Sequence, residues 1–343
     1  MISVGIIGGS GYTGKYLMQF CLNHPMIESI SIYGHSTAGK TLHQIFPELL
    51  NQTRDYTILD SKNISFEHDV YFIALPHGEA LNFVPMLIEK KKIVIDLGGD
   101  YRLDDVNVYA EWYKINHSSP NLLLMKTYGL ADYFDNSDYQ SSLIANPGCY
   151  PTASLLGLLP LTKNFYYKII SANTIAYSGT SGAGKSANQD LSLSEMDGNV
   201  RAYNVNAHRH QPEIEQILAK FGFSSPYSFT THLLPVSTGI YATTTVFLDS
   251  DMSKENIPEL YMEHYADSSF VRMRETPPNL RWVINTNFCD ININVNKNTV
   301  VITSAIDNLI KGASGQAVQN LNKIYNWDET TGLLKGVKNV SVY

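Results

Sequence analysis

One cysteine lies where the sequence passes from a turn into a predicted helix. Cys149 follows a Pro-Gly pair and precedes an apolar, helix-periodic run at 152–159, and Pro151 suits the first position of such a helix. At a helix N-terminus, free backbone N–H groups and the positive end of the helix dipole favour a thiolate over a thiol. Because the thiolate is the nucleophile, we expect Cys149 to be reactive; the alternative is a small buried cysteine beside a turn.

A basic cluster downstream could supply the proton transfer that a nucleophilic sulfur needs. Four of its residues fall within ten positions: Arg201, His208, Arg209 and His210. Pro212 and Glu213 predict that a helix begins directly after them. A histidine at the mouth of a helix can act as a general acid or base near neutral pH, so we assign that role to His210, oriented by Glu213, and leave His208 to bind substrate with Arg209. A solvated basic loop is the plain alternative, and no third ligand has a spacing that favours a metal site.

The elements that would position these residues begin with a nucleotide-binding pattern. A short buried strand at 2–7 is followed by Gly9-Ser10-Gly11-Tyr12-Thr13-Gly14 and then by a helical pattern at 17–22. Strand, G-x-G-x-x-G and helix in this order form the dinucleotide fingerprint, whose glycines let backbone N–H groups approach a pyrophosphate. The alternative is a glycine-rich turn that closes an ordinary strand–helix unit.

The loops after the next strands favour NADP and point to further site residues. The strand at 27–33 ends in a loop without an acidic residue for a ribose hydroxyl, and Ser36 and Lys40 there suit a 2′-phosphate. Two more buried strands, at 70–75 and 92–97, lead to His77 and Arg102. Because the loops at the carboxyl ends of parallel strands build the site in such sheets, we expect both side chains to face a ligand.

A second glycine loop offers a rival interpretation. Residues 179–186, Gly179-Thr180-Ser181-Gly182-Ala183-Gly184-Lys185-Ser186, match the P-loop pattern and follow a strand at 169–177, and a strand at 245–249 ends in an aspartate. The segment after Lys185 is polar and weakly periodic, and the loop follows a domain that already has a phosphate loop. A P-loop phosphotransferase is therefore the weaker hypothesis, and a nucleotide-binding redox sensor with Cys149 as its switch is another.

Composition limits the class of protein. The chain has 343 residues, which favours two domains, and it is 44% hydrophobic and 17% charged. Its net charge is −7 and it has no long basic block, which disfavours nucleic acid and anionic membranes as partners. Three cysteines fit a reducing compartment, and no run approaches the ~18 apolar residues of a membrane span. With an N-terminus that enters a strand at once, these features lead us to expect a cytoplasmic protein.

Together and in this order, the motifs resemble the N-acetyl-gamma-glutamyl-phosphate reductases of the aspartate-semialdehyde dehydrogenase group. The resemblance covers nearly the whole chain and rests on seven segments: residues 8–14, 75–78, 96–102, 146–152, 178–184, 208–214 and 307–316.

The resemblance implies an α/β fold with an N-terminal Rossmann-type parallel sheet at 1–147 and a C-terminal α+β dehydrogenase-type domain at 148–312. The second domain would carry catalysis and the contacts of a homodimer or homotetramer, and a terminal helix at 313–343 would pack back on the first domain. Further cofactor contacts are implied at Gly8, Pro76, His77, Ser178, Gly179, Gly182, Ala183 and Asn308. Substrate contacts are expected at Arg102, Asn146, Arg201 and Arg209.

The implied activity is the NADPH-dependent reduction of N-acetyl-gamma-glutamyl phosphate to the semialdehyde, with phosphate release, in arginine biosynthesis. The acyl group would pass to Cys149 as a thioester while phosphate leaves, and a histidine would move the proton. Acetyl is the N-acyl group usual in the family, and succinyl or a carrier-linked amine would differ only in the lining of the pocket.

Overall fold

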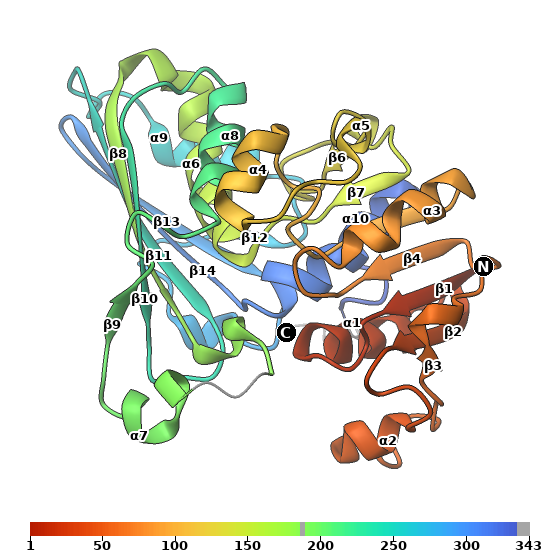
Figure 1. The fold of residues 1–343 in the computed structure, drawn as a ribbon. Coiled ribbons are helices and arrows are strands. Elements are labelled where there is room, and N and C mark those ends of the chain that lie inside the picture. The colour runs from red at the N-terminus through yellow and green to blue at the C-terminus, as the bar shows by residue number, and fades with distance from the viewer. Residues whose placement is uncertain (186–188, 335–343) are drawn as a thin grey trace, which may run out of the picture.

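The computed structural model describes residues 1–185 and 189–334, which form two sheets with the candidate site between them (Figure 1). The first sheet has the strand order β3-β2-β1-β4-β5-β7-β6, and all its pairs are parallel. Its strands are β1 (Ile2–Ile7), β2 (Ile27–Gly34), β3 (Leu59–Asp60), β4 (Val70–Ile73), β5 (Ile93–Asp96), β6 (Thr127–Tyr128) and β7 (Leu143–Ala145). The predicted Rossmann-type parallel sheet is confirmed.

The order of this sheet reverses between β1 and β4, where open sheets of this kind bind ligands beyond the carboxyl ends of their strands. The helices of this half are α1 (Tyr12–Leu22), α2 (Leu42–Ile45), α3 (Val84–Glu89), α4 (Val106–Tyr113) and α5 (Pro120–Leu123). Leu17 and Met18 of α1 are fully buried on the face that the 17–22 pattern predicts.

The second sheet is mixed, with the strand order β12-β13-β14-β11-β8-β10-β9. Its strands are β8 (Ile169–Ser178), β9 (Arg201–Tyr203), β10 (Tyr227–Leu233), β11 (Ile240–Leu248), β12 (Val271–Met273), β13 (Cys289–Asn296) and β14 (Thr299–Ile306). The helices of this half are α6 (Cys149–Phe165), α7 (Leu193–Met196), α8 (Gln211–Lys220) and α9 (Ile257–His264). The predicted α+β architecture of this half is confirmed.

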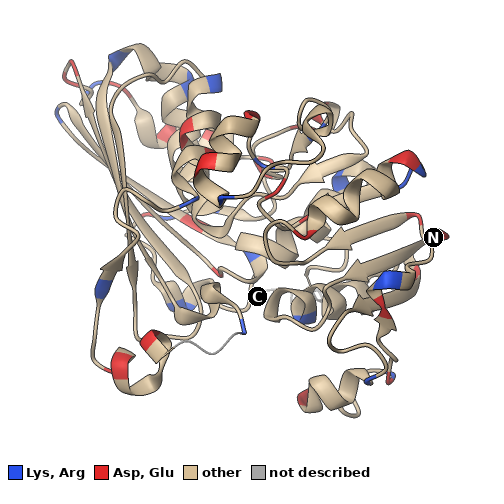
Figure 2. Cartoon of the chain, in the orientation of Figure 1, with Lys and Arg blue, Asp and Glu red and all other residues tan. Residues whose placement is uncertain are grey.

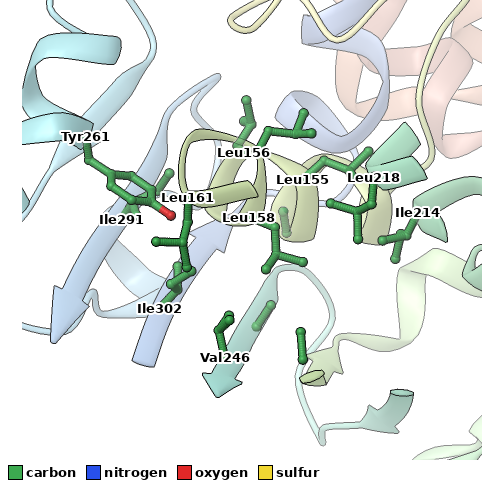
Figure 3. Packing of buried hydrophobic residues seen from close by; sticks show 14 of the residues in the cluster. Leu155, Leu156, Leu158, Leu161, Ile214, Leu218, Val246, Tyr261, Ile291 and Ile302 are labelled. Carbon is green, nitrogen blue, oxygen red and sulfur yellow. The ribbon is translucent and has the colours of Figure 1, made fainter. Parts of the chain in front are cut away.

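Helix α6 is the centre of the second core, because it is buried from Tyr150 to Thr162. Figure 3 shows its leucines between Val246 and Ile302 of the sheet on one side and Ile214 and Leu218 of α8 on another. Buried residues of β11 alternate with half-buried or exposed ones, so one face of the sheet packs on α6 and the other stays open.

The chain returns to the first half after β14. A π-helical turn, η9 (Ile310–Ser314), leads into α10 (Gly315–Ile324), whose Ala317, Val318 and Leu321 share a core with Leu17 and Met18 of α1. The terminal helix is thus shorter than the predicted 313–343, and residues 335–343 lie outside the described residues.

Two asparagines explain the early end of α10. Asn326 adopts a left-handed conformation, with φ at +53°. The Asn322 side chain then binds the carbonyls of Glu329 and Thr331, which turns the chain back along the helix. In the described residues no helix is long and apolar enough to cross a membrane.

Candidate active site

Arg102 joins the segments that meet between the two sheets. It follows β5, is buried, and its Nε donates to the carbonyl of Asn146, 2.8 Å away in the loop after β7. Its Nη1 lies 3.4 Å from His210 Nε2 and 3.5 Å from Glu213 Oε2, both at the start of α8. Three segments far apart in the sequence are therefore held around one guanidinium.

Cys149 is the first residue of α6, so the helix begins two residues earlier than Pro151 predicted. Gly148 caps the helix, and a Cβ at Gly148 would lie 2.5 Å from His210 Nε2 and 2.9 Å from Arg102 Nη1. On the other side, a Cβ at Gly312 would lie 2.6 Å from the Cβ of Cys149. Glycine at these two positions is what lets the nucleophile, the imidazole and the guanidinium come together.

Burial opposes the thiolate that the helix position favours. It raises the pKa of the Cys149 thiol to about 11, while Arg102 and the N–H of Tyr150 act in the opposite direction. The expectation of a preformed thiolate is therefore wrong for the ligand-free protein. For this sulfur to attack a substrate, a base would have to take its proton.

The two histidines of the cluster differ in their surroundings. His208 Nδ1 accepts from the backbone N–H of His210, and its ring packs edge-on against Tyr150, Tyr203 and Phe229. His210 Nδ1 is buried and has no hydrogen-bond partner among the described residues. Burial, with Arg209 second, lowers the pKa of His208 to about 3, and burial with His208 and Arg102 lowers that of His210 well below its usual value. Both rings are neutral at pH 7.

Glu213 does not orient His210, contrary to the prediction. Its Oε1 accepts from the backbone N–H of Gly148 at 2.9 Å and from the hydroxyl of Tyr128 at 2.7 Å, and its Oε2 faces Arg102. A spacing of three residues puts the two side chains on neighbouring turns, but Glu213 points towards the start of α6. Its carboxylate therefore fixes the Cys149 turn and balances the buried Arg102.

Asn146 and Arg201, for which substrate contacts were expected, both make contacts within the protein. The Asn146 side chain is fully buried and bonds to Asn320 of α10 and to the carbonyl of Ala313. Arg201, in the edge strand β9, binds the backbone and carboxylate of Asp190. In the part of the chain that the structure describes, neither side chain makes a hydrogen bond to Cys149, Arg102 or His210. Arg209 is exposed, and its charge lowers the pKa of His77 and His210, so it lies near the cluster.

Asp100 is a residue of the site that the sequence did not single out. It is fully buried and accepts from the backbone N–H groups of Gly78 and Ala80 and from the hydroxyl of Tyr109. It thereby shapes the loop after β4. His77 in that loop accepts from the Gly99 N–H at 3.0 Å, and burial with Arg209 lowers its pKa to about 3. The acidic residue in Gly98-Gly99-Asp100 was the available signal.

The first glycine loop fits a dinucleotide. Gly8 has φ at +93°, and a Cβ there would collide with the Ala74 carbonyl, while a Cβ at Gly14 would lie 2.6 Å from Gly9 Cα. Gly11, before the first residue of α1, has no atom within 4 Å of its Cβ position, so the helix N-terminus is open. Ser36 and Lys40 are exposed in the turn after β2, and Pro76 is exposed after β4.

The second glycine loop faces the first across a cavity of about 720 Å³. One wall is formed by Tyr12, Lys15 and Tyr16 of α1. The other is formed by the second loop, through Thr180, Ser181, Gly184 and Lys185, and by neighbouring loops. Lys185 reaches over so that its Nζ lies 3.4 Å from the carbonyl oxygen of Ser10.

Asn308 holds the second loop from behind. Its Nδ2 donates to Ser181 Oγ at 3.1 Å, and its Oδ1 accepts from the Gly239 N–H at 2.7 Å. A Cβ at Gly182 would lie 3.5 Å from Ser178 Oγ and 3.7 Å from Asn308 Nδ2. Gly179 and Ala183 bracket the short helix η6 (Thr180–Ala183). These residues form one wall of the cavity or its support.

The P-loop interpretation fails on register. Strands β11 and β8 are antiparallel, with Ile240 opposite Ser178 and Leu248 opposite Ile169. Asp249 therefore lies at the end of the sheet away from the 179–185 loop, where it could not hold a metal at phosphates. Ser186 lies outside the described residues. Among the described residues, no group of three histidines, cysteines or carboxylates is arranged to hold a metal ion.

Lysines and arginines alternate along the fold with aspartates and glutamates, as Figure 2 shows, in both halves of the chain.

Comparisons with known proteins bear on both halves. A family profile described as "Semialdehyde dehydrogenase, NAD binding domain" matches residues 3–131, and another described as "Semialdehyde dehydrogenase, dimerisation domain" matches residues 149–308. A protein of Halothermothrix orenii named "N-acetyl-gamma-glutamyl-phosphate reductase" is 41% identical over 97% of this chain and 98% of its own length. One of the same name from Methanococcus maripaludis is 41% identical over 98% of this chain and 99% of its own length.

Solved structures share the fold. An aspartate semialdehyde dehydrogenase II of Vibrio cholerae has a TM-score of 0.72 at 14% identity and covers 95% of this chain and 98% of its own. An aspartate semialdehyde dehydrogenase with NADP from Candida albicans has a TM-score of 0.67 at 16% identity, and it also covers 95% of this chain and 98% of its own. At these identities the likeness concerns the fold.

Proposed function

We propose that this chain, which belongs to the family of N-acetyl-gamma-glutamyl-phosphate reductases, reduces an N-acylglutamyl phosphate to the semialdehyde and releases phosphate. The observation that carries the proposal is the meeting of Cys149, His210 and Arg102 around Gly148. A cavity between the two glycine loops supports it as a place for the cofactor. The relatives' names support an N-acetyl substrate and a place in arginine biosynthesis. The chain is thus an NADP-dependent oxidoreductase that acts on an acyl phosphate.

The nucleophile acts with the neutral imidazole. Cys149 attacks the acyl carbon, the C–O bond to phosphate breaks, and a thioester forms. Because burial keeps the sulfur protonated, its proton passes during the attack to His210 Nε2, the ring nitrogen nearest Gly148. His210 returns the proton when the reduced intermediate releases the aldehyde and the sulfur leaves. His208 supports this step by accepting from the His210 backbone N–H.

Arg102 and Arg209 suit the anionic groups of the substrate. The guanidinium of Arg102 is already fixed by the carbonyls of Leu97 and Asn146 and by Glu213, so it meets developing negative charge without reorganising. Exposed Arg209 adds a second cation at the same cluster. Arg201 would reach the substrate only if its contact with Asp190 opened.

The residues around the cavity fit NADPH, which supplies the hydride when it is bound. The loop from Gly8 to Gly14 would hold the pyrophosphate, and Ser36 with Lys40 the 2′-phosphate. The loop from Ser178 to Ala183, held by Asn308, would close over the cofactor, with Pro76 and His77 beside it.

The domain division and the assembly belong to the same proposal. Residues 1–147 would form the cofactor domain together with the chain after 312, and 148–312 the catalytic domain. Ile170, Ile175 and Phe247 are exposed on the second sheet, and Tyr177 stacks on His232 at 4.8 Å. This open face supports a homodimer or homotetramer, in agreement with a profile described as a dimerisation domain. A biosynthetic enzyme of this kind would work in the cytoplasm.

The reverse reaction tests the proposal. N-acetylglutamate semialdehyde should reduce NADP⁺ only when phosphate or arsenate is present. Cys149→Ser should abolish this turnover while NADPH binding stays near that of the wild type, because a serine hydroxyl stays protonated and is a far weaker nucleophile. Substantial turnover by the serine variant would contradict the covalent route. Reduction without phosphate or arsenate would contradict the acyl-phosphate substrate.

A further inference from the structure

A buried tyrosine hydroxyl without a partner lies beside the candidate active site. Tyr113 is the last residue of α4, and its Oη is buried yet makes no hydrogen bond to any described residue. Buried polar groups are normally paired, because leaving one unpaired costs about 1–3 kcal/mol. The hydroxyl is therefore a candidate to bind something that the protein alone does not supply.

The surroundings of Tyr113 place this hydroxyl on the loops of the site. Its ring stacks on Tyr109 at 4.8 Å and lies 5.1 Å from the ring of His77. A Cβ at Gly99 would collide with Tyr113 Oη, so glycine at that position lets the phenol lie over the loop that carries Arg102. Gly99 also donates its N–H to His77, which makes the phenol, the imidazole and the loop neighbours.

Helix α4, which ends at Tyr113, is held against α8 of the second half of the chain. The carbonyl of Arg102 accepts from Gln216 of α8, and the Gln216 side-chain oxygen accepts from the N–H of Asp104, just before α4. Figure 1 shows α4 beside α8, whose first turn carries Glu213. The loop that carries Arg102 and the segment that leads into α4, the helix of Tyr113, are thus both held to α8.

The charge around the hydroxyl indicates the kind of ligand. Burial raises the pKa of Tyr113 to about 12, and the nearby guanidiniums of Arg102 and Arg209 both act against that rise. The carboxylates of Glu213 and Asp100 add to the rise, so the phenol keeps its proton at neutral pH and is a hydrogen-bond donor. An anionic oxygen of a ligand that lies near the two guanidiniums would be a strong acceptor for it. A phosphoryl group and a carboxylate both offer such oxygens.

We propose that Tyr113 Oη donates a hydrogen bond to an oxyanion oxygen of the substrate, beside Arg102 and Arg209. The inference rests on the proposed function, because the proposed substrate, an N-acylglutamyl phosphate, carries both a phosphoryl group and a carboxylate. Tyr113 is then a substrate-binding residue that acts together with the buried guanidinium.

Tyr133 offers a matched control. Its hydroxyl is also buried without a partner among the described residues, but its ring packs against Phe134, Phe221 and His264, away from the Cys149 cluster. Tyr113→Phe and Tyr133→Phe therefore remove the same atom from similar surroundings, and neither removes a hydrogen bond of the ligand-free protein.

Binding is measured on the NADP⁺-loaded enzyme. Inorganic phosphate should protect Cys149 from iodoacetamide, which gives a phosphate Kd, and the reverse reaction gives KM values for phosphate and for the semialdehyde. Tyr113→Phe should raise the phosphate Kd and KM about tenfold or more, the usual loss for a hydrogen bond to a charged group, with Tm unchanged. Tyr133→Phe should change neither value. A rise confined to the semialdehyde KM would instead assign the bond to the carboxylate.

Two outcomes would overturn the inference. One is an unchanged KM for both ligands in Tyr113→Phe, and the other is a loss of thermal stability in that variant alone, which would mean that the hydroxyl is paired within the protein. Either result leaves the proposed function intact if the wild type shows phosphate-dependent reduction of NADP⁺. A wild type without that reaction would refute the proposed function itself.

Discussion

Neutral histidines around a buried arginine are the main electrostatic feature of the site. Burial and the positive charge of Arg209 lower the pKa values of His77, His208 and His210, and Arg102 adds to the effect at His77 and His210. A neutral imidazole can accept a proton, and Cys149 with its raised pKa has one to give. In the proposed mechanism, the neutral imidazole of His210 therefore acts as the base for the Cys149 thiol, and no ready thiolate is needed.

The two histidines of the cluster should have separable roles. His210→Asn should lower kcat and kcat/KM together by about 10²–10⁴, because it removes the proton acceptor. His208→Asn should mainly raise KM. Steady-state kinetics of both variants make the comparison, and a kcat defect in His208→Asn with only a KM change in His210→Asn would reverse the assignment.

The pH profile adds a second readout for His210→Asn. Without the imidazole, only preformed thiolate can attack, so the residual rate should rise about tenfold per pH unit towards the Cys149 pKa of about 11. In the wild type, the rate should fall with decreasing pH only below pH 6.5. The reason is that the pKa of His210 is lowered in the folded protein, so its imidazole stays neutral down to that pH. A residual rate that does not depend on pH would contradict this account.

Residue types were predictable where chemistry requires them, and side-chain directions were not. Cys149, His210 and Arg102 could be selected from motifs and strand ends, and the structure brings them together. Glu213 and Asn146 lie in the same motifs, yet their side chains point into the protein, towards Gly148 and Asn320. Such directions depend on packing between segments, which spacing along the chain does not encode.

At the scale of elements, the π-helical turn η9 connects the nucleophile to a buried ion pair. Gly312 packs on Cys149, and Lys311 next to it is fully buried, pairs with buried Asp132 and donates to Gln319 at 2.8 Å. Asp132 also accepts from Ser268 at 2.7 Å. Burial and the lysine compete at Asp132, and the lysine keeps the pKa of that carboxyl below its usual value.

Breaking this pair should destabilise the protein more than any surface pair. Lys311→Met leaves a buried carboxylate without its cation and should cost about 3–5 kcal/mol in the free energy of unfolding. Adding Asp132→Asn should recover much of that loss, since both charges are then gone. Lys220→Met breaks a half-exposed pair with Asp104 and should cost less than about 1 kcal/mol. Urea denaturation measures all three, and a small loss in Lys311→Met would contradict the buried-pair account.

Helices and strands with a regular apolar pattern in the sequence could be predicted closely, whereas helix ends without a local pattern could not. Buried runs gave β1, β4 and β5 within two residues, because strands covered on both faces are apolar throughout. The start of α6 was placed two residues late, since Pro151 is tolerated anywhere in the first turn. The end of α10 depends on Asn322 binding carbonyls several residues away, a tertiary contact with no local pattern.

At the scale of the whole molecule, two glycine loops from different sheets face one cavity. Each loop has a nucleotide-binding pattern of its own, so the residues alone left two interpretations of 179–186. The antiparallel register of β8 and β11 decides between them, because it separates Asp249 from the loop. A cofactor in the cavity would contact both halves of the chain and favour their closed arrangement.

Lys185 tests whether one cofactor joins the two halves. Its ammonium lies 3.4 Å from the Ser10 carbonyl of the opposite loop and 4.4 Å from the centre of the Phe46 ring, so it already points across the cavity. Lys185→Ala should weaken NADPH binding about fivefold, the effect of one exposed cation on a phosphate, and should lower the rise in Tm that NADPH causes. Lys254→Ala, a distant surface change, should alter neither the NADPH affinity nor the rise in Tm. An unchanged NADPH affinity in Lys185→Ala would remove Lys185 from the cofactor site.

The same variant tests the P-loop interpretation. No ATP hydrolysis should be measurable in the pure wild-type protein. ATPase activity of the wild type that Lys185→Ala abolishes would restore the P-loop interpretation.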